Sequence, residues 1–274
     1  MNNKILFLCV NYNSYRELDN FIDSIIISTK NHNEEVQIDV MIADNTVDNN
    51  KIINFPVYSS INIDFRPYHE NLGYMGAIMK LINDKGFAKV KDYDYVVFSN
   101  VDLILDKTFI KQLLSVPKNK NIGWIVPKIF SKSEKKDRNP KILRRPSKAH
   151  LNKIVIMFRY PILYILYHNF IYRFRRKQQK HIFKSEIYAG HGSLMIFSKA
   201  FIINNIDFRY PSFLFGEELF FAELNRLSNL KVIYIPKIKV FDIDHISTGS
   251  LKKTHYCKLN KESIEKIIKL FWNE

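Results

Sequence analysis

The chain has 274 residues, of which 46% are hydrophobic and 14% are aromatic, so it can bury a sizeable core and is neither disordered nor fibrous. Its 42 lysines and arginines outnumber its 27 aspartates and glutamates, which gives a formal net charge of +15. Nearly all of this excess lies between residues 131 and 184, where 16 lysines and arginines accompany only two acids. The charge therefore describes one segment rather than a basic protein as a whole.

The two cysteines are too few for a disulfide framework, and no cleavable leader is expected at the amino terminus. The opening apolar run, residues 5–10, has the length of a buried strand. The longest apolar stretch, residues 151–172, is interrupted by charged residues and a proline, whereas a membrane-spanning helix needs about 20 predominantly apolar residues. We therefore expect a cytoplasmic chain without a membrane span.

Short β-rich runs alternate with stretches of helical periodicity through the first half of the chain. The expected strands cover residues 4–10, 36–43, 57–65, 94–98 and 122–126, and the expected helices cover residues 14–28, 71–86 and 107–115. This alternation predicts an α/β fold with a mostly parallel central sheet flanked by helices. Ligands bind beyond the carboxyl ends of the strands in such sheets, so polar residues that follow strands are the candidate site residues.

The second half begins with the basic segment, residues 131–185. We expect it to form a helical insertion, because apolar residues recur at helical spacing after Pro161. The remaining expected elements are a strand over residues 187–197 that contains Gly190-His191-Gly192, a helix over 216–227, strands over 231–235 and 239–244, and a terminal helix over 261–272.

Asn100-Val101-Asp102 follows the very hydrophobic run at residues 95–98. A carboxylate in this place can hold Mg²⁺ or Mn²⁺, because a cation bound to a diphosphate needs only one or two protein carboxylates. A turn or helix-capping role for Asp102 is the alternative interpretation.

Glu217 and Glu218 stand at the start of an expected helix. One of them can act as a general base, which needs an acceptor within hydrogen-bonding reach of a hydroxyl group. A favourable interaction with the helix dipole is the alternative explanation. His245 follows the last expected strand and is either a metal or diphosphate contact or a structural histidine.

The segment from Asn71 to Gly76 opens a helix with two glycines, which permits close backbone approach and anion binding at the helix N-terminus. It lacks the Gly-Lys-Ser/Thr sequence of a P-loop. The dinucleotide fingerprint is also absent, because Val10-Asn11-Tyr12-Asn13 stands where that motif should follow the first strand.

The order of these motifs along the chain is similar to that of one enzyme family. It runs through Val10-Asn11-Tyr12-Asn13, Ala43-Asp44-Asn45-Thr46, Asn71-Leu72-Gly73, Asn100-Val101-Asp102, Gly190-His191-Gly192-Ser193, Gly216-Glu217-Glu218 and His245. This succession resembles the family 2 glycosyltransferases of GT-A fold, and most of all the rhamnosyltransferase-type branch that builds bacterial surface polysaccharides. The resemblance covers about residues 4–130 and 186–250.

The resemblance implies a nucleotide-sugar-binding half over residues 1–130, a basic amphipathic helical insertion over 131–185, and an acceptor-binding and catalytic half with the C-terminal helix over 186–274. It also implies roles for individual residues. The implied catalytic residues are Glu218 and Glu217, the donor-binding residues are Asn11, Tyr12, Asn13, Asp44, Asn45, Asn71, Gly73 and Asn100, the metal ligands are Asp102 and His245, and the acceptor-side residues are His191, Gly192 and Ser193.

Three positions depart from the family pattern, namely Asn100, Glu218 and Phe220. The first acid of the family's D-x-D motif is Asn100 here, and the family's Glu-Asp pair is Glu217-Glu218, so either carboxylate can be the base. The resemblance implies inverting transfer from dTDP-rhamnose or a UDP-hexose to a saccharide acceptor. Glu218 would then be the base, and Mg²⁺ or Mn²⁺ the cofactor.

The apolar part of the basic segment lies between two cationic clusters, Arg144-Arg145 and Arg173–Lys177. This pattern favours an interfacial helix on an anionic membrane surface, where a polyprenyl-diphosphate-linked acceptor would be found. We therefore expect peripheral attachment to the inner face of the cytoplasmic membrane. An insertion that packs on the domain by its apolar residues is the alternative.

Two other functions compete with the enzyme. Basic clusters interleaved with aromatic residues are also compatible with nucleic-acid binding. No nucleic-acid-binding motif is present, however, and we expect the protein to bind no nucleic acid. A catalytically silent assembly partner is the other possibility, since Asn100 and Phe220 both stand at positions that are acidic in the family.

Overall fold

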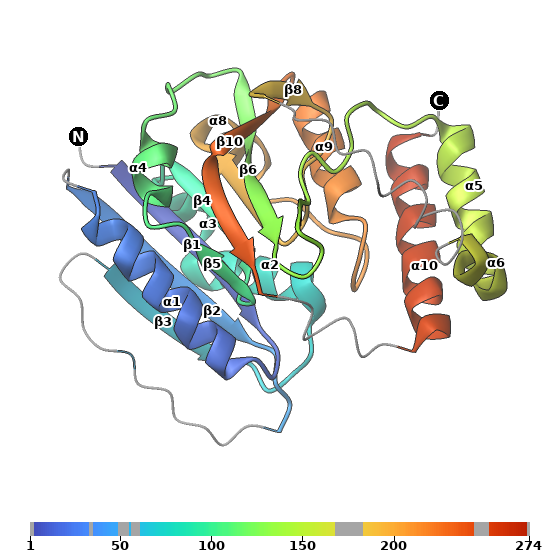
Figure 1. The fold of residues 1–274 in the computed structure, drawn as a ribbon, viewed down its shortest axis with the longest axis horizontal. Coiled ribbons are helices and arrows are strands. Elements are labelled where there is room, and N and C mark those ends of the chain that lie inside the picture. The colour runs from blue at the N-terminus through green and yellow to red at the C-terminus, as the bar shows by residue number, and fades with distance from the viewer. Residues whose placement is uncertain are drawn as a thin grey trace.

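The computed structural model describes residues 3–32, 35–48, 55, 61–167, 183–243 and 252–272. The described chain forms a ten-stranded sheet with helices on both of its faces, and α5, α6 and α10 gather at one end of the molecule (Figure 1). The mixed α/β architecture with a central sheet flanked by helices confirms the fold class that the sequence predicts.

The first half of the chain carries β1 (Asn3–Asn11), α1 (Tyr15–Lys30), β2 (Val36–Asp44), β3 (Ile61–Pro67), α2 (Gly73–Lys85), α3 (Phe87–Val90), β4 (Tyr95–Asn100), β5 (Leu103–Leu105) and α4 (Phe109–Leu114). The second half carries β6 (Ile122–Ser131), β7 (Lys136–Asp137), α5 (Lys148–Arg159), α6 (Pro161–Leu166), β8 (Ser185–Ile187), β9 (Leu194–Ser198), α8 (Lys199–Asn205), α9 (Glu217–Leu227), β10 (Lys231–Asp242) and α10 (Lys253–Phe271).

The main path through the sheet has the strand order β3-β2-β1-β4-β9-β6-β10-β5. The first four strands of this order are parallel, and β9 is inserted antiparallel between β4 and β6. In the register of β1, Asn11 lies opposite Asp44 on β2, and Val10 lies opposite Asn100 on β4. The polar residues that follow these strands therefore meet at one edge of the sheet, where ligands bind in folds of this kind.

The region around residues 187–197 differs from the single strand expected there. It is divided into β8 and β9, and Gly190-His191-Gly192 lies in the connection between them. β8 pairs with β10, whereas β9 pairs with β4 and β6. Gly190 passes close to β6, because a Cβ atom at this position would lie 2.6 Å from the Val126 side chain. The expectation of one strand is wrong because apolar periodicity reports burial and not the pairing partner.

Two more element boundaries differ from the expected ones. The two strands expected over residues 231–244 are a single strand, β10, whose register against β6 shifts between Ile235 and Lys239. Pro236 lies within this shift and has no N–H group to donate to the ladder. The sequence therefore predicts a break between two strands at a point where a single strand is only irregular. α10 begins at Lys253 rather than at residue 261, because Cys257 and Asn260 extend its buried face.

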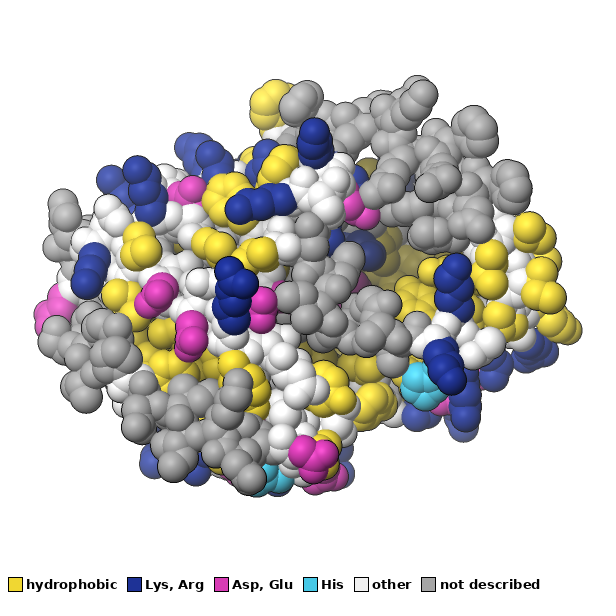
Figure 2. All heavy atoms as spheres, turned by 60° about the horizontal axis from the view of Figure 1, so that its bottom comes forward, with side chains coloured by type: hydrophobic (Ala, Val, Ile, Leu, Met, Phe, Trp, Pro, Cys, Tyr) yellow, Lys and Arg dark blue, Asp and Glu magenta, His cyan; other side chains and the backbone are white. Residues whose placement is uncertain are grey.

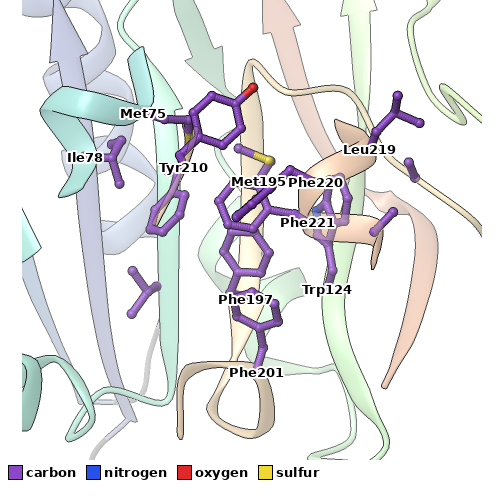
Figure 3. Packing of buried hydrophobic residues seen from close by; sticks show 14 of the residues in the cluster. Met75, Ile78, Trp124, Met195, Phe197, Phe201, Tyr210, Leu219, Phe220 and Phe221 are labelled. Atoms are coloured by element: carbon purple, nitrogen blue, oxygen red, sulfur yellow. The ribbon is translucent and has the colours of Figure 1, made fainter. Parts of the chain in front are cut away.

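Two apolar clusters cover the two faces of the sheet, and β1 contributes alternate residues to them. Phe7 belongs to the cluster beneath α1 and α4, whereas Leu6 belongs to the cluster that joins α2, α8, α9 and α10. Figure 3 shows Phe220 and Phe221 of α9 within the second cluster, and their ring centroids lie 5.3 Å apart. Burial of each such side chain contributes about 1.5–3 kcal/mol, so the helix that begins with Glu217 is firmly anchored.

The basic segment is tied to the rest of the chain. Asp137 Oδ2 accepts a hydrogen bond from the Tyr234 hydroxyl at 2.5 Å. Arg145 donates hydrogen bonds of 2.8 and 3.1 Å to the carboxylate of the buried Glu223 on α9, and α5 packs against α10. The expected continuation of the apolar helix through Phe170 and Phe174 lies outside the described residues. None of the helices described has the length and apolar character that crossing a bilayer requires.

Candidate functional site

A cavity of about 890 Å³ opens at the carboxyl edge of the sheet, where the start of α9 faces the ends of β1 and β4. Residues from α6, from the start of α10 and from the basic segment complete its wall. The residues predicted from the sequence that line this cavity are Tyr12, Asn45, Asn71, Gly73, Asn100, Asp102, His191, Gly192, Ser193, Glu217 and Glu218. Residues predicted for the donor, the metal, the acceptor and catalysis therefore share one space.

Three of the predicted donor-binding residues do not line the cavity. Asn11 and Asp44 are completely buried, and Asn11 Nδ2 donates a 3.0 Å hydrogen bond to Asp44 Oδ1. The other carboxylate oxygen of Asp44 accepts a 2.7 Å bond from the Tyr15 hydroxyl. The backbone N–H of Asn13 donates to the Thr46 hydroxyl, which itself donates to Asp44. This network joins the loops after β1 and β2 and holds Tyr12 and Asn45 at the cavity wall.

Asn45 lines the cavity and carries an unused hydrogen-bond acceptor. Its Nδ2 donates a 3.0 Å hydrogen bond to the Gly73 carbonyl, whereas its Oδ1 is buried and has no partner among the described residues. Gly73 has a φ of +70°, and a Cβ atom there would lie 2.2 Å from the Phe213 carbonyl oxygen, so only glycine fits this turn. Asn71 Oδ1 accepts a 3.1 Å bond from the Gly73 N–H and fixes the start of α2. A buried acceptor without a partner is costly and is suited to a ligand's hydrogen-bond donor.

Asp102 and Asp242 form the acidic side of the cavity. The Asp102 carbonyl accepts a 3.2 Å hydrogen bond from the N–H of Ile243, so the two carboxylates come from adjoining backbone. Burial and the neighbouring charge of Asp242 raise the pKa of Asp102 to about 6. Asp242 itself forms a 2.5 Å ion pair with Arg138.

The acidic side fits a divalent cation that takes its other ligands from a diphosphate and water, because crowded carboxylates are relieved by a positive charge. Asp102 would hold it. Within the described part of the chain, no group of three or more histidine, cysteine, aspartate or glutamate residues is arranged so that it could hold a metal ion by itself. His245, the second predicted metal ligand, lies outside the described residues.

Glu217 and Glu218 occupy different surroundings at the start of α9. Burial, and then repulsion by Glu218, raise the pKa of Glu217 above its usual range. A Cβ atom on Gly192 would lie 2.4 Å from Glu217 Oε1, so the absence of a side chain at Gly192 lets this carboxyl group fit. Glu218 Oε1 accepts a 3.4 Å hydrogen bond from the Gly192 N–H and lies 4.0 Å from Lys141 Nζ. Burial and the nearby carboxylate thus favour the protonated form of Glu217.

The acceptor-side loop is ordered by its own hydrogen bonds. Asn139 Oδ1 accepts a 2.8 Å bond from the His191 N–H, and His191 Nδ1 lies 3.0 Å from the Ser193 hydroxyl. The Ser193 carbonyl accepts a 2.9 Å bond from the N–H of Asn100. The loop that carries the predicted acceptor-side residues is thus attached directly to the end of β4.

Sequence reasoning missed several groups that line the cavity, and these include Tyr74, Arg138, Lys141, Asp242, Lys253 and His255. Arg138 and Lys141 come from the basic segment, whose charge suggested a surface and not a site. Lys253 comes from a part of α10 that was not expected to be helical. Tyr74 directly follows the Asn71-Leu72-Gly73 motif, and this adjacency is the one signal that could have indicated it.

Comparison with known proteins shows the fold. No family model matches the sequence, and no curated protein matches it. Solved structures that match include GalNAc-T7 with UDP, GalNAc and Mn²⁺, at a TM-score of 0.57 and 9% identity, and S. aureus TarS, at a TM-score of 0.51 and 10% identity. Each match covers 98% of this chain, but only 49% and 43% of those longer chains. The chain has a glycosyltransferase fold of the GT-A type.

Proposed function

We propose that the protein is an inverting glycosyltransferase that uses a nucleotide sugar. The observation that carries this proposal is that Asp102, at the end of β4, and the Glu217-Glu218 pair, at the start of α9, line the same cavity. Such an arrangement places a leaving group near one carboxylate and an acceptor hydroxyl near another, as a single displacement requires. The shared fold with GT-A glycosyltransferases supports the proposal.

Glu218 is the base in this proposal. The raised pKa of Glu217 favours the protonated form of that carboxyl group, which accepts no further proton. Glu218 lines the cavity, where the N–H of Gly192 orients its carboxylate. It would accept the proton of the acceptor hydroxyl as that oxygen bonds to the anomeric carbon and the nucleoside diphosphate leaves.

Asp102 and Arg138 serve the leaving group. A Mg²⁺ or Mn²⁺ ion at Asp102 would neutralise charge on the diphosphate, and the GalNAc-T7 structure was solved with Mn²⁺. Arg138 lines the same cavity and adds a fixed positive charge close to Asp102. Asn45 Oδ1 and Asn71 lie on the wall towards the loops after β1 and β2, where they would contact the nucleoside and sugar of the donor.

The donor and the pathway follow from the sequence resemblance. We propose dTDP-rhamnose or a UDP-hexose as the donor, and a saccharide linked to a polyprenyl diphosphate as the acceptor, in bacterial surface polysaccharide synthesis. The likeness of the motif order to the rhamnosyltransferase-type branch supports these choices.

The exposed surface of α5 and α6 supports peripheral attachment to the inner face of the cytoplasmic membrane. Figure 2 shows apolar side chains beside lysines and arginines at the end of the molecule that α5, α6 and α10 form. The large apolar side chains exposed on these two helices and their junction are Ile156, Tyr160, Ile162, Leu163 and Leu166. Tyr164 and Ile165 of α6 line the cavity, so a lipid-linked acceptor could pass from this surface to Glu218.

A donor screen tests the proposed function. Nucleotide sugars, including dTDP-L-rhamnose and UDP-glucose, are added with and without Mn²⁺, and the melting temperature and the release of nucleoside diphosphate are measured. We expect at least one donor to stabilise the protein and to be turned over when an acceptor is supplied. Stabilisation without any turnover would instead favour a silent assembly partner, and the absence of both would contradict the proposal.

A further inference from the structure

Tyr74 lines the cavity, and its hydroxyl is a polar group for which the mechanism above has no use. Its oxygen is buried and has no hydrogen-bond partner among the described residues. The described tyrosines include no other with a buried hydroxyl that lacks a partner. Burial of a hydroxyl group without a partner costs free energy, so such a group in a cavity indicates a missing ligand.

The place of Tyr74 in the chain explains why its side chain points to the site. It occupies the first turn of α2, directly after Gly73, whose positive φ and close contact with Phe213 fix the start of the helix. The cavity wall includes both Asn45 and Tyr74, and these are the two residues of that wall with an unpartnered buried atom among the described residues. Asn45 offers an acceptor, its Oδ1 atom, and Tyr74 offers a donor, its hydroxyl group.

Tyr74 is surrounded by groups that disfavour ionisation of its phenol. Burial is the main cause that raises its pKa, and repulsion by acidic groups that include Glu217, Asp102 and Glu218 adds to this effect. The hydroxyl group therefore stays protonated and acts as a donor. None of the surrounding carboxylates in the described chain accepts its hydrogen bond.

We propose that the Tyr74 hydroxyl donates a hydrogen bond to the sugar that is transferred. This inference rests on the proposed function, in which the sugar lies between the diphosphate near Asp102 and the base Glu218. Tyr74 lines the same cavity as Asp102 and Glu218, and in this inference its hydroxyl group donates to the sugar ring that is held there. It thus contributes to recognition of the sugar and not of the nucleotide.

The Tyr74→Phe substitution removes only the hydroxyl group. The binding of UDP, UDP-glucose, dTDP and dTDP-L-rhamnose to the wild type and the variant is measured by calorimetry. We expect the affinity for the bound nucleotide sugar to fall about three- to tenfold and the affinity for its nucleoside diphosphate to stay unchanged. The melting temperature of the free variant should not fall, because no bond within the protein is lost.

Tyr93→Phe is the matched control. The Tyr93 hydroxyl donates to the buried Asp39, and Tyr93 does not line the cavity. This variant should melt at a lower temperature and keep every affinity. If Tyr74→Phe lost equal affinity for the nucleotide sugar and for the nucleoside diphosphate, the inference would be overturned and the hydroxyl would be assigned to the diphosphate. If the variant lost no affinity for either ligand, the inference would also be overturned. A wild-type protein that binds none of the four ligands would contradict the proposed function itself.

Discussion

Arg138 Nη1 lies 2.5 Å from Asp242 Oδ2, and both side chains are almost completely shielded from solvent. This ion pair connects the basic segment with the end of β10 and lies beside Asp102. The charge of Asp242 raises the pKa of Asp102, and that of Arg138 lowers it. A residue of the segment that looked like a surface insertion in the sequence therefore helps to set the charge at the centre of the site.

Arg138→Ala is expected to destabilise the protein by about 3–5 kcal/mol, because it leaves the carboxylate of Asp242 buried without its partner. Denaturation with urea, followed by circular dichroism, measures this loss. Arg66→Ala is the control, since the pair between Arg66 and Asp64 is largely exposed, and its loss should cost less than about 1 kcal/mol. Similar effects of the two substitutions would show that the pair between Arg138 and Asp242 is no stronger than a surface pair.

Asp102 should make the stability of the metal-free protein depend on pH. Its pKa is raised from 3.8 to about 6 on folding, so the folded protein holds this proton more tightly than the unfolded chain does. The resulting stability is fully present below about pH 4 and is lost as the pH rises through about 6. Between these two pH values, we expect the free energy of unfolding of the wild type to fall by about 2–3 kcal/mol more than that of Asp102→Asn. Denaturant titration at both pH values measures this difference. Parallel pH profiles for the two proteins would contradict the raised pKa.

Substitution of each glutamate by glutamine should separate the roles of the pair. Glu218→Gln removes the base and is expected to lower transfer by about 10²–10⁴-fold while donor binding survives. Glu217→Gln replaces a carboxyl group whose raised pKa favours its neutral form, so most of the activity should remain. The release of nucleoside diphosphate measures the transfer activity of both variants.

Glu186→Gln serves as a control for the glutamine series, because Glu186 is exposed on β8 and pairs with Lys231 outside the cavity. Its activity should equal that of the wild type. If Glu217→Gln lost activity and Glu218→Gln kept it, the assignment of the base would be reversed.

The local elements of the site were predictable from the sequence, because each depends on a strand followed by a polar turn. The ends of β1, β2 and β4 and the start of α9 are recognisable in this way, and the structure brings residues from each to one edge. The division of residues 187–197 into two strands was not predictable, since both strands are buried and differ only in their partners. Arg138 and Asp242 are 104 positions apart, and no local periodicity reports such a contact.

Gly192→Ala should impair the site through a steric effect. The added Cβ atom would lie 2.4 Å from Glu217 Oε1, so the Glu217 side chain or the loop after β8 must shift. We expect a loss of about 1–3 kcal/mol in stability and a clear loss of transfer. Gly76→Ala is the control, because its Cβ atom would meet nothing closer than 3.5 Å within α2, where alanine is favoured by about 0.5–1 kcal/mol. A stable and fully active Gly192→Ala variant would show that this contact is not needed.

The apolar surface of α6 is expected to bind anionic membranes. Ile162 and Leu166 have exposed fractions of 73% and 49%, so their substitution by aspartate should leave the fold intact. Burial of such a side chain in a bilayer interface contributes about 1.5–3 kcal/mol, and the added negative charges repel anionic lipids. The double variant Ile162→Asp with Leu166→Asp should therefore bind vesicles that contain phosphatidylglycerol at least about tenfold more weakly, by flotation.

A second double variant distinguishes this surface from general exposure of apolar residues. Ile203 on α8 and Leu227 on α9 are exposed to 50% and 58%, and neither belongs to α5 or α6. Their substitution by aspartate adds the same charge, so it should reduce vesicle binding only slightly. Equal losses in the two double variants would show that net charge and not the α6 surface governs attachment. Binding to DNA or RNA is measured by gel shift with the same variants. If the α6 substitutions abolished this binding and left flotation with vesicles unchanged, the α6 surface would be assigned to nucleic acid.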